Sequence, residues 1–144
     1  MAAASAIINK FGKLAGWNSI TVNLLGRDVE GITEIEYNDN IALEVVMGQG
    51  AYPIGWAEGN YVAKASITLY SEEWNAIQAS LLPGSHVHEI APFPIIVEYD
   101  YSGFKRRDTF MAKIMGRGVT AKQGDKTLSN KADLLVLGKI LWNI

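Results

Sequence analysis

The sequence predicts a mainly β protein, with two packed antiparallel sheets in a sandwich or barrel-like arrangement and one α-helix over residues 71–82. Hairpin patterning at 31–47 and 95–115 and an apolar closing segment at 132–144 indicate the strands. The helix is indicated where the alternating pattern that follows Asn60 changes to a helical period. A helix of about ten residues is marginal alone and must pack on something, and sheet is the only partner that the sequence offers.

The composition bounds what the chain can do. Its 144 residues predict a single domain over residues 1–144 that buries about two thirds of its unfolded surface. A formal net charge of -2 gives no basic field for gripping nucleic acid through its phosphates. The absence of cysteine excludes disulfides and thiolate metal sites. The first residues resemble neither a signal peptide nor a membrane span, so we expect assembly in the cytoplasm.

Residues 1–16 are interpreted as an N-terminal arm, because Gly12 and Gly16 interrupt an apolar run that is too short for a helix. Two interpretations stay open, a frayed chain end and an arm that docks on a neighbouring subunit. Residues 19–25 then predict a short strand, and residues 26–28 predict the turn after it. The docking residues of this N-terminal segment would be Ile7, Ile8, Phe11 and Leu14.

The segment 31–47 predicts a hairpin that turns at residues 38–40, where asparagine and aspartate are turn formers. With that loop, Tyr37 would face Ile41, and Ile35 would face Leu43. Glu34 would lie opposite Glu44, with Glu36 beside them. Like charges directly opposed cost a few tenths of a kcal/mol, so this acidic face should be exposed to water. A solvated sheet face is the commoner explanation of such a cluster, and a functional acidic face is the alternative.

Two short motifs indicate ligand sites only weakly. Residues 48–59 predict a glycine-rich loop, but Tyr52 and a proline stand where the helix of a phosphate-binding turn should begin. Tyr52 and Trp56 are therefore open as packing or contact residues. His86 and His88 could share one face of a strand and hold zinc, but no third ligand is marked, which favours a surface or hydrogen-bonded pair.

The segment 60–84 joins a strand directly to the helix. Alternate residues from Tyr61 to Leu69 lie on one side of a two-residue period, as in a half-buried strand. Ser71 can cap the helix with its hydroxyl, and two glutamates follow in the first turn, where the helix dipole favours them. A Pro-Gly pair ends the helix. The apolar face of the helix would consist of Trp74, Ile77, Leu81 and Leu82.

The last third of the chain predicts more sheet. Segment 95–115 forms a hairpin around Ser102 and Gly103, which would pair Asp100 with Lys105 and Glu98 with Arg107. Segment 122–131 is polar and predicts an exposed loop or hairpin tip. Segment 132–144 is apolar on both faces, so we expect it in the middle of a sheet stack or at a subunit junction. One face carries Leu134, Val136, Ile140 and Trp142, and the other carries Leu135, Leu137 and Leu141.

Three segments together resemble the tail tube proteins of contractile-tailed phages and the related tubes of contractile injection systems. They are GNYVAKASITLYSEEWNAIQASL, APFPIIVEYDY and KQGDKTLSNKADLLVLGKILWN, and the similarity spans residues 32–143. The resemblance implies a structural virion protein whose six copies form a ring. Stacked rings would form the inner tail tube through which DNA passes during ejection. It also implies sheath, baseplate and tail terminator partners, no cofactor and no membrane.

The residues suit such a role. Glu34, Glu36 and Glu44 are the candidates for an acidic channel lining, which would repel phosphate and let a duplex slide. The candidates for contacts between subunits or rings are Ile7, Ile8, Phe11, Leu14, Tyr52, Trp56, Leu135, Leu137 and Leu141.

Other functions remain open to different degrees. A related tube could deliver protein effectors from a phage-derived contractile injection or secretion system. A monomeric β-barrel could instead bind a small ligand with Trp17, Tyr52 and Trp56 around a pocket. We expect no enzyme, because the sequence offers no nucleophile with a paired base, no metal set and no phosphate cradle.

Overall fold

The structure is a computed structural model that describes residues 16–101 and 104–144. These residues form seven strands, one α-helix and two short 3-10 helices, so the mainly β prediction with one helix is confirmed. The elements in chain order are η1 (Trp17–Ser19), β1 (Ile20–Leu24), β2 (Arg27–Val29), β3 (Ile32–Met47), β4 (Pro53–Tyr70), α1 (Ser71–Ala79), η2 (Val87–Glu89), β5 (Phe93–Tyr101), β6 (Phe104–Ile114) and β7 (Ser129–Leu141).

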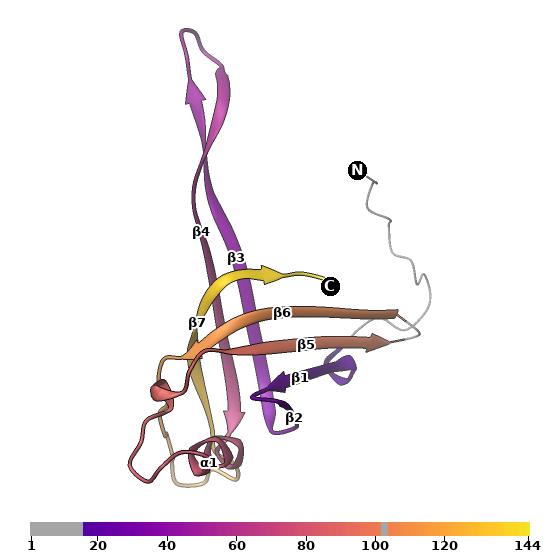
Figure 1. Cartoon of the computed structure of the whole chain (residues 1–144), viewed down its shortest axis with the longest axis vertical. Helices are drawn as coiled ribbons and strands as arrows, with labels where there is room; N and C mark the ends of the chain where they lie inside the picture. Colours follow the sequence, from indigo (N-terminus) through magenta and orange to yellow (C-terminus); the bar gives the residue numbers. More distant parts are fainter. Residues whose placement is uncertain (1–15, 102–103) are drawn as a thin grey trace.

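The strands form one antiparallel sheet in the order β2-β1-β5-β6-β7-β4-β3, and no ladder between described residues joins its two edges, β2 and β3. The prediction of two packed sheets is therefore wrong. The reason lies in β7, which pairs with β4 near its start and with β6 farther along. Figure 1 shows β7 curving from the direction of β4 into that of β6. Two extra residues between Leu137 and Leu141, with Gly138 at a φ of 73°, allow this curvature.

The two halves of the bent sheet, β3–β4 and β5–β6, pack against each other. Tyr37 on β3 lies with its ring centroid 5.3 Å from that of Phe110 on β6, so the inner face of the β3–β4 half meets the inner face of the β5–β6 half. The outer faces of the two halves therefore point away from each other. The core between them includes Val22, Ile67, Leu69, Trp74, Ile95, Val97, Phe110, Ile114, Leu134 and Ile140.

The predicted turn at residues 38–40 is wrong. β3 continues through these residues, with Asn38, Asp39 and Asn40 paired to Lys64, Ala63 and Val62 of β4. Tertiary contacts outweigh the local turn preference, because the Asp39 carboxylate accepts hydrogen bonds from Tyr61 Oη at 2.6 Å and Trp142 Nε1 at 3.1 Å. The hairpin loop falls instead between Met47 and Pro53, so the glycine-rich loop predicted over 48–59 is mostly strand.

This longer hairpin also changes the predicted cross-strand pairs. Glu34 and Glu44 lie on the same strand, and Tyr37 and Ile41 do as well, so the predicted pairing of these residues is wrong. The observed partners on β4 are Thr68 for Glu34, Ser66 for Glu36 and Ala57 for Glu44.

Helix α1 begins at Ser71 but ends at Ala79, three residues before the predicted end. The N-cap is Tyr70, and no side chain caps the helix, so the capping role predicted for Ser71 is wrong. The backbone N–H of Ser71 instead donates to the Leu128 carbonyl at 2.9 Å. Trp74 and Ile77 are buried as predicted, whereas Leu82 lies in the following loop and is exposed.

The remaining elements follow the sequence closely. The β5–β6 hairpin has the predicted register, with Glu98 opposite Arg107, although its turn residues 102–103 lie outside the described residues. β1 starts at Ile20 because Ser19 belongs to η1. Arg27 and Asp28, predicted in a turn, begin β2, and the turn uses Leu25 and Gly26 with positive φ.

Candidate assembly surfaces

The outer part of the β3–β4 hairpin is a two-stranded ribbon, which we call the arm and define as residues 41–61. The described ladder of β7 on β4 ends at Lys64, so β4 has β3 as its partner in the arm and no described neighbour on its other side. Figure 1 shows the arm projecting beyond the rest of the sheet. A two-stranded hairpin is at best marginally stable in water by itself, so this ribbon needs another surface.

The arm is apolar and uncovered. Tyr52 and Trp56 are 82% and 66% exposed, which fits their predicted role as contact residues better than a role in the core. Such a concentration of exposed apolar side chains marks an interaction surface, because monomeric proteins rarely expose large contiguous apolar patches. The other exposed large apolar residues of the arm are Ile41, Leu43, Val45, Val46, Met47, Ile54 and Tyr61.

A second apolar surface lies where β7 curves, on the outer face of the sheet. We call it the β6–β7 patch, and it consists of Met111, Leu135, Leu137 and Leu141, which are 39–48% exposed. Leu137 pairs with Met111, and Leu135 pairs with Lys113 of β6 and Lys64 of β4. Of the two apolar faces predicted for the closing strand, one is thus largely buried by the chain itself and the other is uncovered.

The acidic candidates Glu34 and Glu36 lie on the outer face of the β3–β4 half. The register places the Lys64 side chain on this same face and continues it to Lys131 and Asp133 of β7. Glu36, Lys64, Lys131 and Asp133 line one shallow depression. This face therefore carries charges of both signs, and Glu44 lies apart from it, in the arm.

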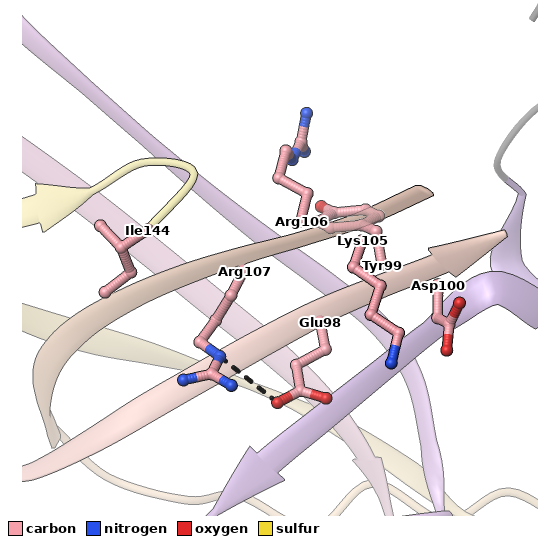
Figure 2. Close-up of a pocket in the computed structure, with 7 residues that line it drawn as sticks. All are labelled: Glu98, Tyr99, Asp100, Lys105, Arg106, Arg107 and Ile144. Carbon is pink, nitrogen blue, oxygen red and sulfur yellow. Dashed lines mark ion pairs between the residues drawn. The ribbon is translucent and has the colours of Figure 1, made fainter. Parts of the chain in front are cut away.

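A depression formed by β5 and β6 is lined by charged groups from both faces of the two strands (Figure 2). Arg107 Nε lies 3.4 Å from Glu98 Oε1, and both side chains are about half exposed. The Arg106 guanidinium lies 4.2 Å from the centre of the Tyr99 ring. Exposed pairs of this kind contribute about 0 to 1 kcal/mol, so they fix local geometry more than they stabilise the fold.

The histidine pair does not form a metal site in this structure. His88 lies in η2 and His86 directly precedes it, and their rings stack 5.0 Å apart. In the part of the chain that the structure describes, no group of three His, Asp or Glu residues could hold a metal ion.

The aromatic residues of the ligand-pocket alternative are not brought together. Tyr52 and Trp56 lie in the arm, whereas Trp17 lies in η1, which directly precedes β1 in the chain. All three are exposed, and Trp17 borders a shallow depression with residues of β1 and β2.

Sequence reasoning missed a buried polar network that ties the chain's last residues to the bend of the sheet. Asp108 of β6 is fully buried and accepts hydrogen bonds from Tyr37 Oη and from the backbone N–H of Asn143, the latter at 2.9 Å. Tyr37 Oη also lies 2.9 Å from Tyr99 Oη. A lone aspartate in a charged hairpin carries no sequence signal of this role, because the partners come from β3 and the chain end.

A second carboxylate holds the same terminal segment. Asp39 accepts hydrogen bonds from Tyr61 Oη and Trp142 Nε1, and these bonds lower the pKa of the Asp39 carboxyl group. Tyr61 Oη in turn accepts a hydrogen bond from the Ile140 backbone N–H at 3.1 Å. The base of the arm and the end of β7 are therefore fixed to each other.

The network predicts a loss of stability in alkali. Burial, followed by the hydrogen bond to Asp108, raises the pKa of Tyr37 far above its ordinary value of about 10. Above about pH 10 the unfolded chain releases the Tyr37 proton while the folded chain keeps it. The contribution of Tyr37 to the free energy of unfolding is therefore complete below about pH 10 and declines above it. Unfolding free energies measured by urea titration should fall from about pH 10 upward, and Tyr37→Phe should flatten that fall.

The control for this prediction is Tyr52→Phe, which changes an exposed ring of the arm. This variant should follow the wild-type pH dependence. An equal slope for wild type and Tyr37→Phe above pH 10 would contradict the role of Tyr37.

Two solved structures contain chains of similar fold. A chain of the virion of a native gene transfer agent particle matches with a TM-score of 0.52 and 12% sequence identity, over 91% of this chain and 100% of that chain. A chain of the anti-feeding prophage baseplate, six-fold symmetrised, matches with a TM-score of 0.51 and 10% identity, over 85% of this chain and 90% of that chain. No family model and no curated protein matches the sequence.

The fold is thus shared with chains of a gene transfer agent virion and of the anti-feeding prophage baseplate, which confirms at the level of fold the resemblance to phage-tail-like particles seen in the sequence. Both similar chains belong to assembled particles. Within the described residues, the structure has no helix of the length and apolar character needed to cross a bilayer.

Proposed function

We propose that this protein is the subunit of a tail tube, in which six copies close into a ring and rings stack into a hollow tube inside a contractile tail. The arm carries the proposal, because an uncovered, two-stranded apolar ribbon requires burial against other copies. The similar chain in a six-fold symmetrised baseplate supports a ring of six. DNA would pass through the tube without specific binding, and the protein would reside in the virion.

The contacts between copies would use the N-terminal residues 1–16, strand β7 near the C-terminus, and the arm of residues 41–61. β3 is a long edge strand, and a ring protects such edges by joining neighbouring copies. Sheath, baseplate and tail terminator proteins are the further partners we propose. The proposed contact residues are Tyr52 and Trp56 of the arm, Leu135, Leu137 and Leu141 of β7, and, outside the described residues, Ile7, Ile8, Phe11 and Leu14.

The outer face of the β3–β4 half would line the channel. Glu34 and Glu36 remain our candidates there, and Glu44 would lie farther along the tube axis with the arm. The carboxylates disfavour adhesion of phosphate, while Lys131 on the same face moderates the field.

This mixture of charges favours a second candidate function. A channel wall carrying Lys131 beside Glu36 and Asp133 is also compatible with protein cargo. The alternative is therefore the tube of a phage-derived contractile injection or secretion system that delivers protein effectors. In both functions the protein acts through assembly and shape, and we propose no enzymatic role.

The test is the size and shape of the purified protein. We expect the wild-type chain to elute as a large assembly and to show rings or tubes by negative-stain electron microscopy. The variant Tyr52→Ser/Trp56→Ser should remain small while keeping the circular dichroism of a folded sheet, because it removes two of the most exposed aromatic side chains of the arm.

The matched control is Leu82→Ser, which removes an exposed apolar side chain in the loop after α1. It should assemble like the wild type. A wild-type chain that stays monomeric at high concentration would contradict the proposed function, and so would a double variant that forms normal rings.

A further inference from the structure

We propose that the arm of one copy seats on the β6–β7 patch of another copy through the face that carries Leu43, Val45 and Trp56, with the arm carboxylate Glu58 against Lys64. This inference deepens the proposed function and rests on it, since it requires copies to associate. It identifies the receiving surface and the chemistry that selects it.

The arm cannot cover the patch of its own chain. The ladder of β7 on β4 ends at Lys64, so the arm leaves the sheet beside the patch and continues in the direction of β3 and β4. Figure 1 shows it extending away from the curve of β7. Cross-strand hydrogen bonds keep the ribbon extended, so a fold back onto its own patch would require these ladder bonds to break.

The patch has an apolar centre between two cations. The register aligns Lys64 of β4, Leu135 of β7 and Lys113 of β6 in one row across three strands. The next row pairs Leu137 with Met111. Lys64, Leu135, Leu137 and Met111 are exposed and Lys113 is half-buried, so the surface presents neighbouring apolar groups with a lysine on each flank.

The arm has the complementary pattern. It contains no Lys or Arg, and its only charged residues are Glu44 and Glu58. Leu43 pairs with Glu58 and Val45 with Trp56, so these four side chains share one face of the ribbon, an apolar face with one carboxylate. Glu44 pairs with Ala57 in the rung between them and therefore lies on the opposite face. An apolar centre with complementary charges at its rim is the usual composition of a specific interface, and the charges fix its register.

The contact would also propagate the assembly. An arm seated on a neighbour's patch leaves the first copy's patch and the second copy's arm available, which is a head-to-tail contact. Such contacts generate rings or stacked arrays and do not stop at a dimer. A single surface pair therefore serves a tube built from one kind of chain.

The absence of native cysteine permits a direct test by crosslinking. Two variants, Val45→Cys on the arm and Leu137→Cys on the patch, would be mixed and treated with a short bismaleimide. We expect the crosslinked dimer in the mixture at least about tenfold more abundant than in either variant alone. The control replaces the patch variant with Leu82→Cys, an exposed position in the loop after α1, and should give background crosslinking.

A charge exchange gives a second readout. Glu58→Lys and Lys64→Glu should each raise the protein concentration needed for assembly by about tenfold or more. The double variant Glu58→Lys/Lys64→Glu, which restores opposite charges, should assemble near the wild-type concentration, whereas Glu44→Lys changes the opposite face of the arm and should have a smaller effect. The changed positions are exposed, so circular dichroism should show the same fold throughout.

The outcomes separate the two proposals. Wild-type rings or tubes without the arm–patch crosslink, or without rescue by the Glu58→Lys/Lys64→Glu variant, would overturn this inference and leave the tube proposal standing. A wild-type chain that forms no assembly would overturn the proposed function itself. A crosslink in the mixture together with rescue would support both.

Discussion

Replacing Trp74 with alanine is expected to lower the free energy of unfolding by about 3–5 kcal/mol, the usual cost of removing a large buried aromatic side chain. Trp74 is fully buried between α1 and the sheet, and its Nε1 donates a hydrogen bond to the Asn130 carbonyl at 3.2 Å. Arg117 Nη1 donates to the Trp74 carbonyl at 3.3 Å, which brings the 115–128 segment to the same point. A nine-residue helix depends on such packing, because it is too short to be stable alone.

Chemical denaturation followed by circular dichroism measures this loss, and Trp56→Ala is the matched control. Trp56 is an exposed tryptophan of the arm, so its removal should change the unfolding of the unassembled chain by less than about 1 kcal/mol while it weakens assembly. Similar unfolding free energies for the two alanine variants would show that α1 does not depend on Trp74.

The strands and the helix could be predicted where local pattern and tertiary structure agree. The β5–β6 register followed from the two-residue turn and the opposite charges at Glu98 and Arg107. The position of α1 followed from Trp74 and Ile77, which share one helical face and are both buried. Its last predicted turn failed because Leu82, which is 79% exposed, gains no burial against the described residues.

The largest error came from residues whose local preference and tertiary environment disagree. Asn38, Asp39 and Asn40 are strong turn formers, yet the Asp39 carboxylate has partners at Tyr61 and Trp142 that make the extended conformation favourable. Trp142 lies 103 residues farther along the chain, so no local pattern contains that information. The loop of the β3–β4 hairpin lies about ten residues later than the predicted turn at residues 38–40. This difference extends the hairpin into the arm of residues 41–61, which the sequence did not predict.

The candidate contact residues are apolar residues for which the sequence predicts no partner within the chain. Tyr52, Trp56, Leu135, Leu137 and Leu141 are all exposed in the structure. Their part in contacts between copies remains a prediction. The sequence could not show that they form two separate surfaces, because that depends on where β7 leaves β4.

Replacing Asp108 with alanine is expected to lower the free energy of unfolding by about 2–4 kcal/mol, because two donors that it serves lose their acceptor. Tyr37 Oη and the Asn143 backbone N–H both point at this fully buried carboxylate, and Arg106 Nη2 lies 3.5 Å from it. These donors belong to β3, the chain end and β6, so the substitution acts where the two halves of the sheet meet. Asp108→Asn keeps an acceptor oxygen and should cost less.

The control is Asp100→Ala, which removes an exposed carboxylate from the same hairpin and should cost less than about 1 kcal/mol. Amide hydrogen exchange separates a local effect from a general one. Loss of Asp108 should accelerate exchange at Asn143 more than at the core of β5, because the Asn143 N–H has lost its acceptor. Uniform acceleration across the sheet would contradict a specific attachment of the chain end and would assign Asp108 to general core stability.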